Sequence, residues 1–267
     1  MADTLSHIVK AVRRFPPLLA IQRARYRRGF PHWLGAFHGV YGSFAEALAA
    51  APSDRPTGYD AKGPAGMYED RLSRVFPSDY PVLFWLDRLL QPNQHMVDFG
   101  GHVGIAFYAY QRYLTYPEGF RYTVVDVPAV VERGRELAQE RGEARIGFTA
   151  DPESVGPFDL LLASGSTQYL EPADPLATLG ATGQLPEHVL LHRIPVHPRH
   201  GFVTLQNIGT AFCPYRIYRR DAVLHGIDER GYEIVDEWEN LEHRCVFPLD
   251  SEHSVPSYTG FYLRRRH

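Results

Sequence analysis

The residue types best suited to chemistry lie where an apolar stretch beginning at Val97 runs into glycines, in the order Asp98-Phe99-Gly100-Gly101-His102-Val103-Gly104. Glycines let the backbone turn tightly and approach a ligand without a clash from Cβ atoms. A strand, a glycine loop and a helix in this order form the general layout of a nucleotide-type cofactor site. The GxGxxG pattern of dinucleotide-binding loops is absent, because position 102 is histidine and position 105 is isoleucine.

Two acids narrow the choice of cofactor. Asp98 stands directly before the glycines, where a carboxylate repels a pyrophosphate and attracts a cation such as the methionine part of S-adenosylmethionine (SAM). Asp126 ends the apolar run that starts at Tyr122, a place from which a carboxylate can accept hydrogen bonds from ribose hydroxyls. Alternatively, Asp126 only caps the helix that starts at Pro128. The predicted cofactor site also includes Val127, which follows Asp126.

Further polar residues follow the next predicted strands. Asp151, after the strand 146–149, can accept a hydrogen bond from an adenine amino group or can simply cap the following turn. Ser164 ends the apolar run 158–163, and ligands of open parallel sheets bind at the carboxyl ends of the strands. We therefore expect Ser164 beside the cofactor. Tyr169 could orient an acceptor there, or it packs on the edge of the sheet.

Histidines are the natural candidates for a general base. A histidine beside an acceptor hydroxyl can take its proton, because the pKa of the ring lies near neutral pH. The predicted catalytic residues are His192, Tyr169 and His102. For His192, a buried core histidine is the alternative interpretation. A zinc site at His192, His197 and His200 is not expected, because their spacing matches no helical pair and prolines break the segment.

From His95 onward, predicted strands alternate with predicted helices, and these elements must position the residues named above. Strands are predicted at 96–99, 122–126, 146–149, 158–163 and 189–194, and helices at 105–114, 128–139 and 175–179. Such alternation is typical of βαβ units in a parallel sheet. Two late strands, 232–238 and 258–263, have no long helix between them and predict an antiparallel pair at one edge. Residues 91–267 are therefore assigned to a cofactor-binding α/β domain.

Residues 1–90 lack this alternation and are predicted to form a helical cap. Ser43 with Glu46 forms a capping-box pattern before a helix over 44–51. A second helical stretch is expected over 68–90, with a break marked by Pro77 and Pro81. From Lys10 to Arg28 the chain carries seven basic residues and no acid. This charge is either a solvated helix face or a weak contact with an anionic membrane surface or acceptor.

Composition excludes several classes. A formal net charge of −3 argues against a general nucleic-acid binder. Cys213 and Cys245 form no CxxC pair, which favours a reducing compartment over a disulfide scaffold. No apolar run approaches the roughly 18 residues of a membrane span, and the first ten residues lack a signal-peptide core. A cytoplasmic location is expected.

The glycine segment resembles motif I of class I SAM-dependent methyltransferases. More narrowly, the chain resembles a family of bacterial methyltransferases often found among polysaccharide and surface-glycan genes. The matching stretches are 38–44 with Glu46-Ala47, 98–104, 125–134, 165–170, 205–208 and 258–261. The resemblance implies a Rossmann-like, seven-stranded, mostly parallel sheet with an antiparallel last strand. It also implies that Asp98, Gly100, Gly101 and Gly104 surround the methionine part and that Asp126 holds the ribose.

The chain departs from this motif at His102, where the family has its middle glycine. The predicted activity is transfer of a methyl group from SAM to a small-molecule or glycan acceptor, with O-methylation preferred. The alternatives are an NAD-dependent Rossmann oxidoreductase, against which Asp98 counts, and a non-catalytic SAM-fold partner subunit, which a degenerate glycine loop would favour.

Overall fold

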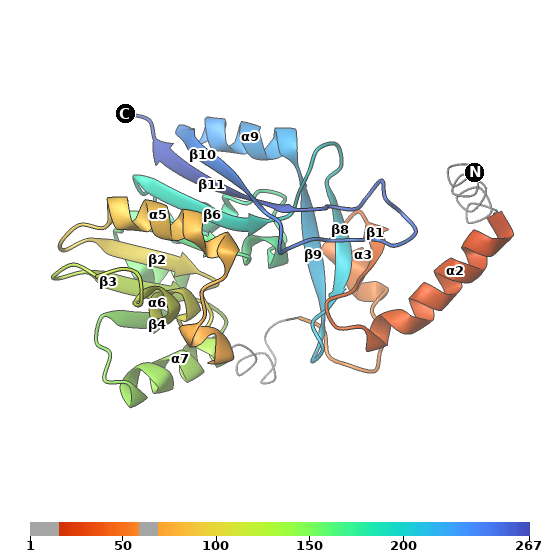
Figure 1. Cartoon of the computed structure of the whole chain (residues 1–267), viewed down its shortest axis with the longest axis horizontal. Coiled ribbons are helices and arrows are strands. Elements are labelled where there is room, and N and C mark those ends of the chain that lie inside the picture. Colours follow the sequence, from red (N-terminus) through yellow and green to blue (C-terminus); the bar gives the residue numbers. More distant parts are fainter. Residues whose placement is uncertain (1–15, 59–68) are drawn as a thin grey trace, which may run out of the picture.

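A seven-stranded mixed sheet forms the centre of the structure, a computed structural model that describes residues 16–58 and 69–267 (Figure 1). The strand order is β10-β11-β6-β5-β2-β3-β4. The strands β2 to β6 all run parallel to one another. The strand β11 lies between β6 and β10 and runs antiparallel to both. The predicted Rossmann-like, mostly parallel sheet with an antiparallel last strand is therefore confirmed. Its strands are β2 (His95–Phe99), β3 (Arg121–Val125), β4 (Ile146–Thr149), β5 (Leu160–Ser164), β6 (His188–Ile194), β10 (Tyr232–Asn240) and β11 (Tyr258–Arg265).

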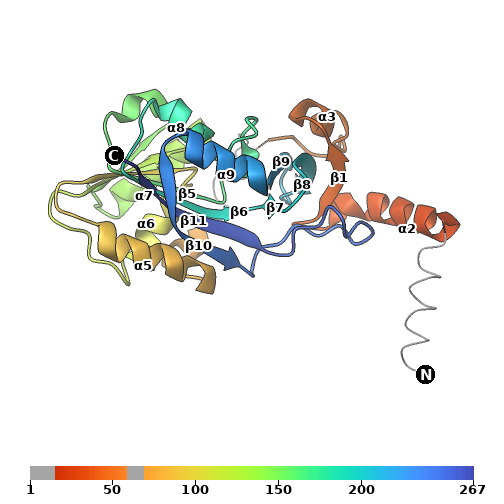
Figure 2. The same ribbon diagram turned by 90° about the horizontal axis from the view of Figure 1, so that it is seen from above.

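Helices cover both faces of this sheet, α5 and α6 on one side and α8 and α9 on the other (Figure 2). The sequence of the central strand β5 is continuously apolar because both of its faces are buried. Leu160 and Leu162 pack into the first layer, and Leu161 and Ala163 into the second. A strand buried on both faces has no position for a polar side chain. The helices are α5 (Tyr80–Leu89), α6 (Ile105–Tyr110), α7 (Pro128–Glu140), α8 (Ala177–Thr182) and α9 (Arg220–Glu229).

A second, four-stranded sheet lies beside the first and has the order β1-β8-β9-β7. Its strands are β1 (Phe37–Tyr41), β7 (Val196–His197), β8 (Phe202–Asn207) and β9 (Phe212–Arg219). The N-terminal region, predicted to be a helical cap, contains one strand that was not expected, β1, which pairs with β8. The stretches 205–207 and 212–218 lie within β8 and β9. The domain boundary near residue 90 stays a prediction.

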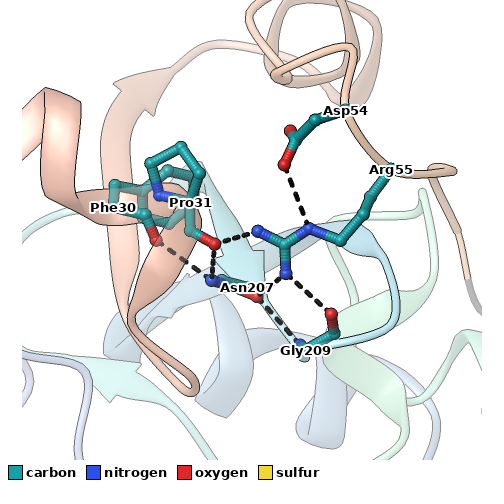
Figure 3. A network of polar contacts seen from close by, with 6 residues as sticks. All are labelled: Phe30, Pro31, Asp54, Arg55, Asn207 and Gly209. Atoms are coloured by element: carbon teal, nitrogen blue, oxygen red, sulfur yellow. Dashed lines mark hydrogen bonds and ion pairs between the residues drawn. The ribbon is translucent and has the colours of Figure 1, made fainter.

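The helix α2 (Pro16–Gly29) projects from the small sheet (Figures 1 and 2). A polar network at its base, shown in Figure 3, joins it to the end of β8. The amide of the buried Asn207 donates to the carbonyls of Phe30 (3.0 Å) and Pro31 (3.1 Å). Arg55 donates to Oδ1 of Asn207 (3.1 Å) and to the carbonyls of Gly209 (2.7 Å) and Pro31. Asn207 therefore has a structural role.

Several helices differ in extent from the sequence expectation. The predicted helix over 68–90 is three pieces in its described part: two 3₁₀ turns, Glu69–Ser73 and Pro77–Asp79, followed by α5. The prolines at 77 and 81 account for the break, because proline favours the first turn of a helix over its interior. Helix α6 ends at Tyr110, earlier than expected. None of the described helices is long and apolar enough to cross a membrane.

The predicted cap at Ser43 is confirmed at the start of α3 (Phe44–Ala49), but the return bond of a capping box goes to the Gly42 amide and not to that of Ser43. The Glu46 amide donates to Ser43 Oγ (3.2 Å), and Glu46 Oε2 accepts from the Gly42 amide (2.8 Å). We expect Ser43→Ala to lower the free energy of unfolding by about 1 kcal/mol, because it removes the acceptor of a free helix amide. Urea denaturation measures this change. Ser53→Ala, in an exposed loop, is the control, and an equal loss in both variants would contradict the capping role.

Candidate cofactor and acceptor site

The glycine loop occupies residues 100–104, between the end of β2 and the start of α6. Gly100 (φ 72°) and Gly104 (φ 86°) adopt the left-handed conformation that glycine tolerates best. The Gly100 amide donates to the Val125 carbonyl at 2.7 Å, which fixes the loop to β3. A Cβ atom on Gly100 would lie 2.2 Å from the Cβ of Ser166. The glycine loop therefore packs tightly against the loop that follows β5, as two parts of one site.

His102 also adopts the left-handed conformation, with φ 56°. This conformation is uncommon for a residue with a side chain. The His102 amide donates to Oδ2 of Asp126 at 2.9 Å, and the residue is buried. The loop thus keeps the backbone conformation that the glycines provide, even though the middle glycine of the motif is replaced.

Asp126 lies just after β3, where it links the glycine loop to the following helix. Besides the His102 amide at Oδ2, it accepts the Val127 amide at Oδ1 (2.8 Å). Burial raises the pKa of Asp126, and the two amide hydrogen bonds oppose this rise. Each carboxylate oxygen has a second lone pair, so the group can still accept from ribose hydroxyls. Asp126 therefore fixes the glycine loop and can hold a ribose, but it does not cap α7, whose N-cap Val127 has no side-chain cap hydrogen bond.

Asp98 is a carboxyl group buried beneath the loop, with 1% of its surface exposed. The Tyr122 hydroxyl donates to Oδ2 at 2.6 Å, whereas Oδ1 has no hydrogen-bond partner among the described residues. Burial raises the pKa of Asp98 to about 7, although the bond from Tyr122 lowers it. A Cβ atom on Gly101 would lie 2.2 Å from Oδ2, so only glycine fits there. A buried carboxyl with an unpaired oxygen would be stabilised in its charged form by a cation.

The loop after β5 contains other predicted residues. Ser164 is half-buried at the end of the strand, and the next residue, Gly165, has φ 67°. Tyr169 faces the small sheet: its hydroxyl donates to Gln206 Oε1 (2.6 Å), and its ring packs on Tyr215. Asp151 is exposed and accepts the Glu153 amide at 3.0 Å, as a turn cap. The observed contacts thus match the structural alternatives for these residues, which are packing at the edge of the sheet for Tyr169 and capping of a turn for Asp151.

His192, the predicted general base, is completely buried on β6. Its Nε2 lies 3.4 Å from Asp79 Oδ1, and its Nδ1 accepts from Trp238 Nε1, also at 3.4 Å. Burial lowers its pKa to about 4. Both ring nitrogens therefore face protein groups, which is the geometry of a neutral core histidine.

The residues around His192 form a polar cluster that the sequence did not indicate. Asp79 accepts hydrogen bonds from Arg193 (2.7 Å), the Tyr110 hydroxyl (3.3 Å) and the Phe76 amide (2.8 Å). Arg193 has φ 57°, a strained conformation of the kind that concentrates at functional sites. We define the polar cluster as Asp79, His192, Arg193, Trp238, Asn240 and His243. No local sequence signal marks it, because its members come from the 3₁₀ turn before α5, from β6, and from the end of β10 and the turn that follows.

The remaining histidines of the predicted group pack with one another. His197 Nδ1 accepts from the amides of Arg199 (3.1 Å) and His200 (2.9 Å), and the ring of His200 packs against His253. Within residues 16–58 and 69–267, no group of three or more histidine, cysteine or acidic residues is arranged to hold a metal ion.

Comparisons with known proteins show similarity in fold. No family model and no curated protein matches the sequence. Among solved structures, the [4+2]-cyclase SpnF is 13% identical, with a TM-score of 0.51 over 86% of this chain and 98% of that one. A SAM-dependent methyltransferase from Clostridium acetobutylicum is 12% identical, with a TM-score of 0.48 over 78% of this chain and 96% of that one.

A third similar structure is the 1,6-didemethyltoxoflavin-N1-methyltransferase of Burkholderia thailandensis, bound to its substrate and to S-adenosylhomocysteine. It is 19% identical, with a TM-score of 0.46 over 72% of this chain and 79% of that one. At such identities the similarity extends to the α/β fold alone. A fold does not determine an activity, so the activity must be argued from the site itself.

Proposed function

We propose that this protein binds SAM and transfers its methyl group to a small-molecule or glycan acceptor, with O-methylation preferred. The observation that carries the proposal is the buried Asp98, whose unpaired oxygen lies beneath the glycine loop. A dinucleotide pyrophosphate would meet a carboxyl group there, whereas the methionine part of SAM would bring a compensating positive charge. Asp126, at the end of the neighbouring strand, would hold the ribose.

The protein's contribution to the reaction would be alignment and proton removal. Bound SAM would supply a methyl group on a sulfonium, which is already a good leaving group. Holding an acceptor in line with that methyl can contribute on the order of 7 kcal/mol. A hydroxyl acceptor must also lose its proton to a nearby base. We assign the acceptor side to the carboxyl ends of β5 and β6, where the loop after β5 contacts the glycine loop.

Two rival functions make different use of the same loop. An NAD-dependent oxidoreductase is disfavoured by Asp98 and by the missing GxGxxG pattern. A non-catalytic partner subunit would be favoured by a collapsed loop, but His102 keeps the left-handed turn through its bond to Asp126. We further propose that the protein works in the cytoplasm, consistent with its two free, buried cysteines.

A thermal-shift titration tests the proposal. At ten times the dissociation constant, SAM is expected to stabilise the folded state by about 1.4 kcal/mol, because it binds only that state. S-adenosylhomocysteine should act similarly and NAD should have no effect. Stabilisation by NAD without any response to SAM would reject the proposal.

The pKa of Asp98 predicts a pH-dependent affinity. With a pKa of about 7, the carboxyl group is mostly protonated at pH 6 and attracts a cation only after losing its proton. We expect SAM to bind roughly eightfold more weakly at pH 6 than at pH 7.5 in calorimetric titrations. Asp98→Asn should bind weakly with little pH dependence. A wild-type affinity that is constant over this range would contradict the role of Asp98.

The raised pKa of Asp98 also determines how the stability of the ligand-free protein changes with pH. Because the pKa of Asp98 is raised in the folded chain, its contribution to stability is fully present below its ordinary value of 3.8. That contribution is lost as the pH rises to about 7. SAM should therefore stabilise the protein more at pH 7.5 than at pH 6.

A further inference from the structure

The polar cluster lies beside the proposed cofactor loop. A Cβ atom on Gly165 would lie 3.6 Å from Gln168 Nε2 and 3.7 Å from Arg193 Cβ, so both side chains flank the end of β5. On its other side, the loop after β5 contacts the glycine loop through Ser166 and Gly100. The cluster and the proposed methyl donor therefore share one end of the sheet, separated by one short loop.

Several buried polar atoms in this region lack a hydrogen-bond partner among the described residues. They are Thr167 Oγ1, Gln168 Oε1, His192 Nε2, Arg193 Nε, Asn240 Oδ1, Asn240 Nδ2 and His243 Nδ1, of which His192 Nε2 still lies 3.4 Å from Asp79. Asn240 is fully buried and leaves both ends of its amide unpaired. Buried polar atoms in folded proteins are nearly always paired, so such a concentration indicates a missing partner. A bound molecule would supply that partner.

The chemistry of these atoms defines what fits them. Arg193 Nε and Asn240 Nδ2 are donors, whereas Gln168 Oε1 and Asn240 Oδ1 are acceptors. A hydroxyl group both donates and accepts, so a molecule with several hydroxyls matches such a mixture. Arg193 leaves little charge for an anion, because its guanidinium is paired with Asp79 at 2.7 Å. Trp238 and Tyr258 add aromatic rings beside His192 and His243.

His243 differs from His192 in one respect that matters for catalysis. Both nitrogens of His192 face Asp79 or Trp238, but His243 Nδ1 has no partner. The His243 ring is half-buried and packs on Tyr258, with centroids 5.9 Å apart. Burial lowers the pKa of His243 to about 4, as it does for His192, so both rings are neutral at neutral pH and this property does not distinguish them. His243 is thus the histidine of the cluster that is free to act as a base.

We propose that the polar cluster, together with Gln168, is the acceptor site, that it takes a neutral polyhydroxylated molecule of the sugar class, and that His243 Nδ1 takes the proton of the reacting hydroxyl. This inference rests on the proposed function. The acceptor oxygen forms a bond to the methyl carbon as the carbon–sulfur bond breaks, and the electron pair stays on sulfur. The hydroxyl proton goes to His243 and then to solvent. The products are a methyl ether and S-adenosylhomocysteine.

The test combines cofactor binding with acceptor selection on the full chain. Calorimetry with S-adenosylhomocysteine first establishes cofactor binding. Transfer of labelled methyl from SAM is then measured with methyl glycosides of neutral hexoses and 6-deoxyhexoses, with hexuronates, with benzylamine and with catechol. We expect transfer to neutral glycosides. Cofactor binding with transfer only to the other acceptors, or to none, overturns the inference and leaves SAM binding standing. Absence of cofactor binding instead rejects the proposed function.

Two variants probe the cluster. His243→Gln should lower kcat by about a hundredfold with little change in KM, as for loss of a general base. Asn240→Leu should mainly raise KM, by about tenfold. S-adenosylhomocysteine affinity should stay within twofold in both, and His225→Gln, at an exposed histidine on α9, should behave as wild type. If Asn240→Leu does not fold, His243→Gln decides alone. An unchanged kcat for that variant with a good glycoside acceptor overturns the role of His243.

Discussion

Replacing Asp79 with alanine is expected to lower the free energy of unfolding by about 3–5 kcal/mol, the range typical of a buried ion pair broken on one side. Asp79 is 4% exposed and lies 2.7 Å from the Arg193 guanidinium and 3.4 Å from His192. Without it, the partly buried arginine keeps its charge and loses its carboxylate. Guanidinium denaturation of the wild type and the variant measures the loss.

Asp87→Ala, on the helix α5 that follows Asp79, is the control. Asp87 is 69% exposed and lies 3.9 Å from Arg88, so its removal should change stability by less than about 1 kcal/mol. Burial raises the pKa of Asp79, but His192, Arg193 and the Phe76 amide lower it to a net value below the ordinary 3.8. Its stabilisation should therefore persist above pH 4 and disappear as the pH falls further. A loss for Asp79→Ala no larger than the control's would show that the cluster contributes little to folding.

Replacing Asp126 with alanine is expected to weaken SAM binding about ten- to a hundredfold. This corresponds to roughly 1.5–3 kcal/mol for a lost hydrogen bond to a charged acceptor. The same substitution should also lower the free energy of unfolding by about 1 kcal/mol, because the carboxylate accepts the His102 and Val127 amides. Calorimetric titration and a denaturation curve on the same variant separate the two effects.

Asp126→Asn provides an intermediate case, because it keeps one acceptor oxygen and loses the charge. Its affinity for SAM should lie between those of the wild type and the alanine variant. Unchanged affinity in both variants, with reduced stability, would identify Asp126 as an anchor of the glycine loop only. The cofactor proposal would then depend on Asp98 and the glycine loop.

Local sequence determined the parts of this protein whose contacts are close along the chain. The order of β2, glycine loop, α6 and β3, the cap at Ser43 and the antiparallel pair of β10 and β11 were all predicted. In each case a short pattern suffices: apolar alternation, turn glycines, or a serine three residues before a glutamate. The acids at the ends of β2 and β3 were found for the same reason, because strand ends in a parallel sheet converge at one edge.

Tertiary structure alone decided the second sheet and the polar cluster. The strand β1 exists because Phe37 pairs with Gln206, a partner far along the chain that no local pattern reveals. Asp79 meets His192 and Arg193 only when α5 packs beside β6, and this contact occupies the histidine that the sequence favoured as a base. Burial then determines which groups are charged and which nitrogen is free. Such properties depend on every neighbour in space, so they follow from the packed fold and not from residue type or spacing.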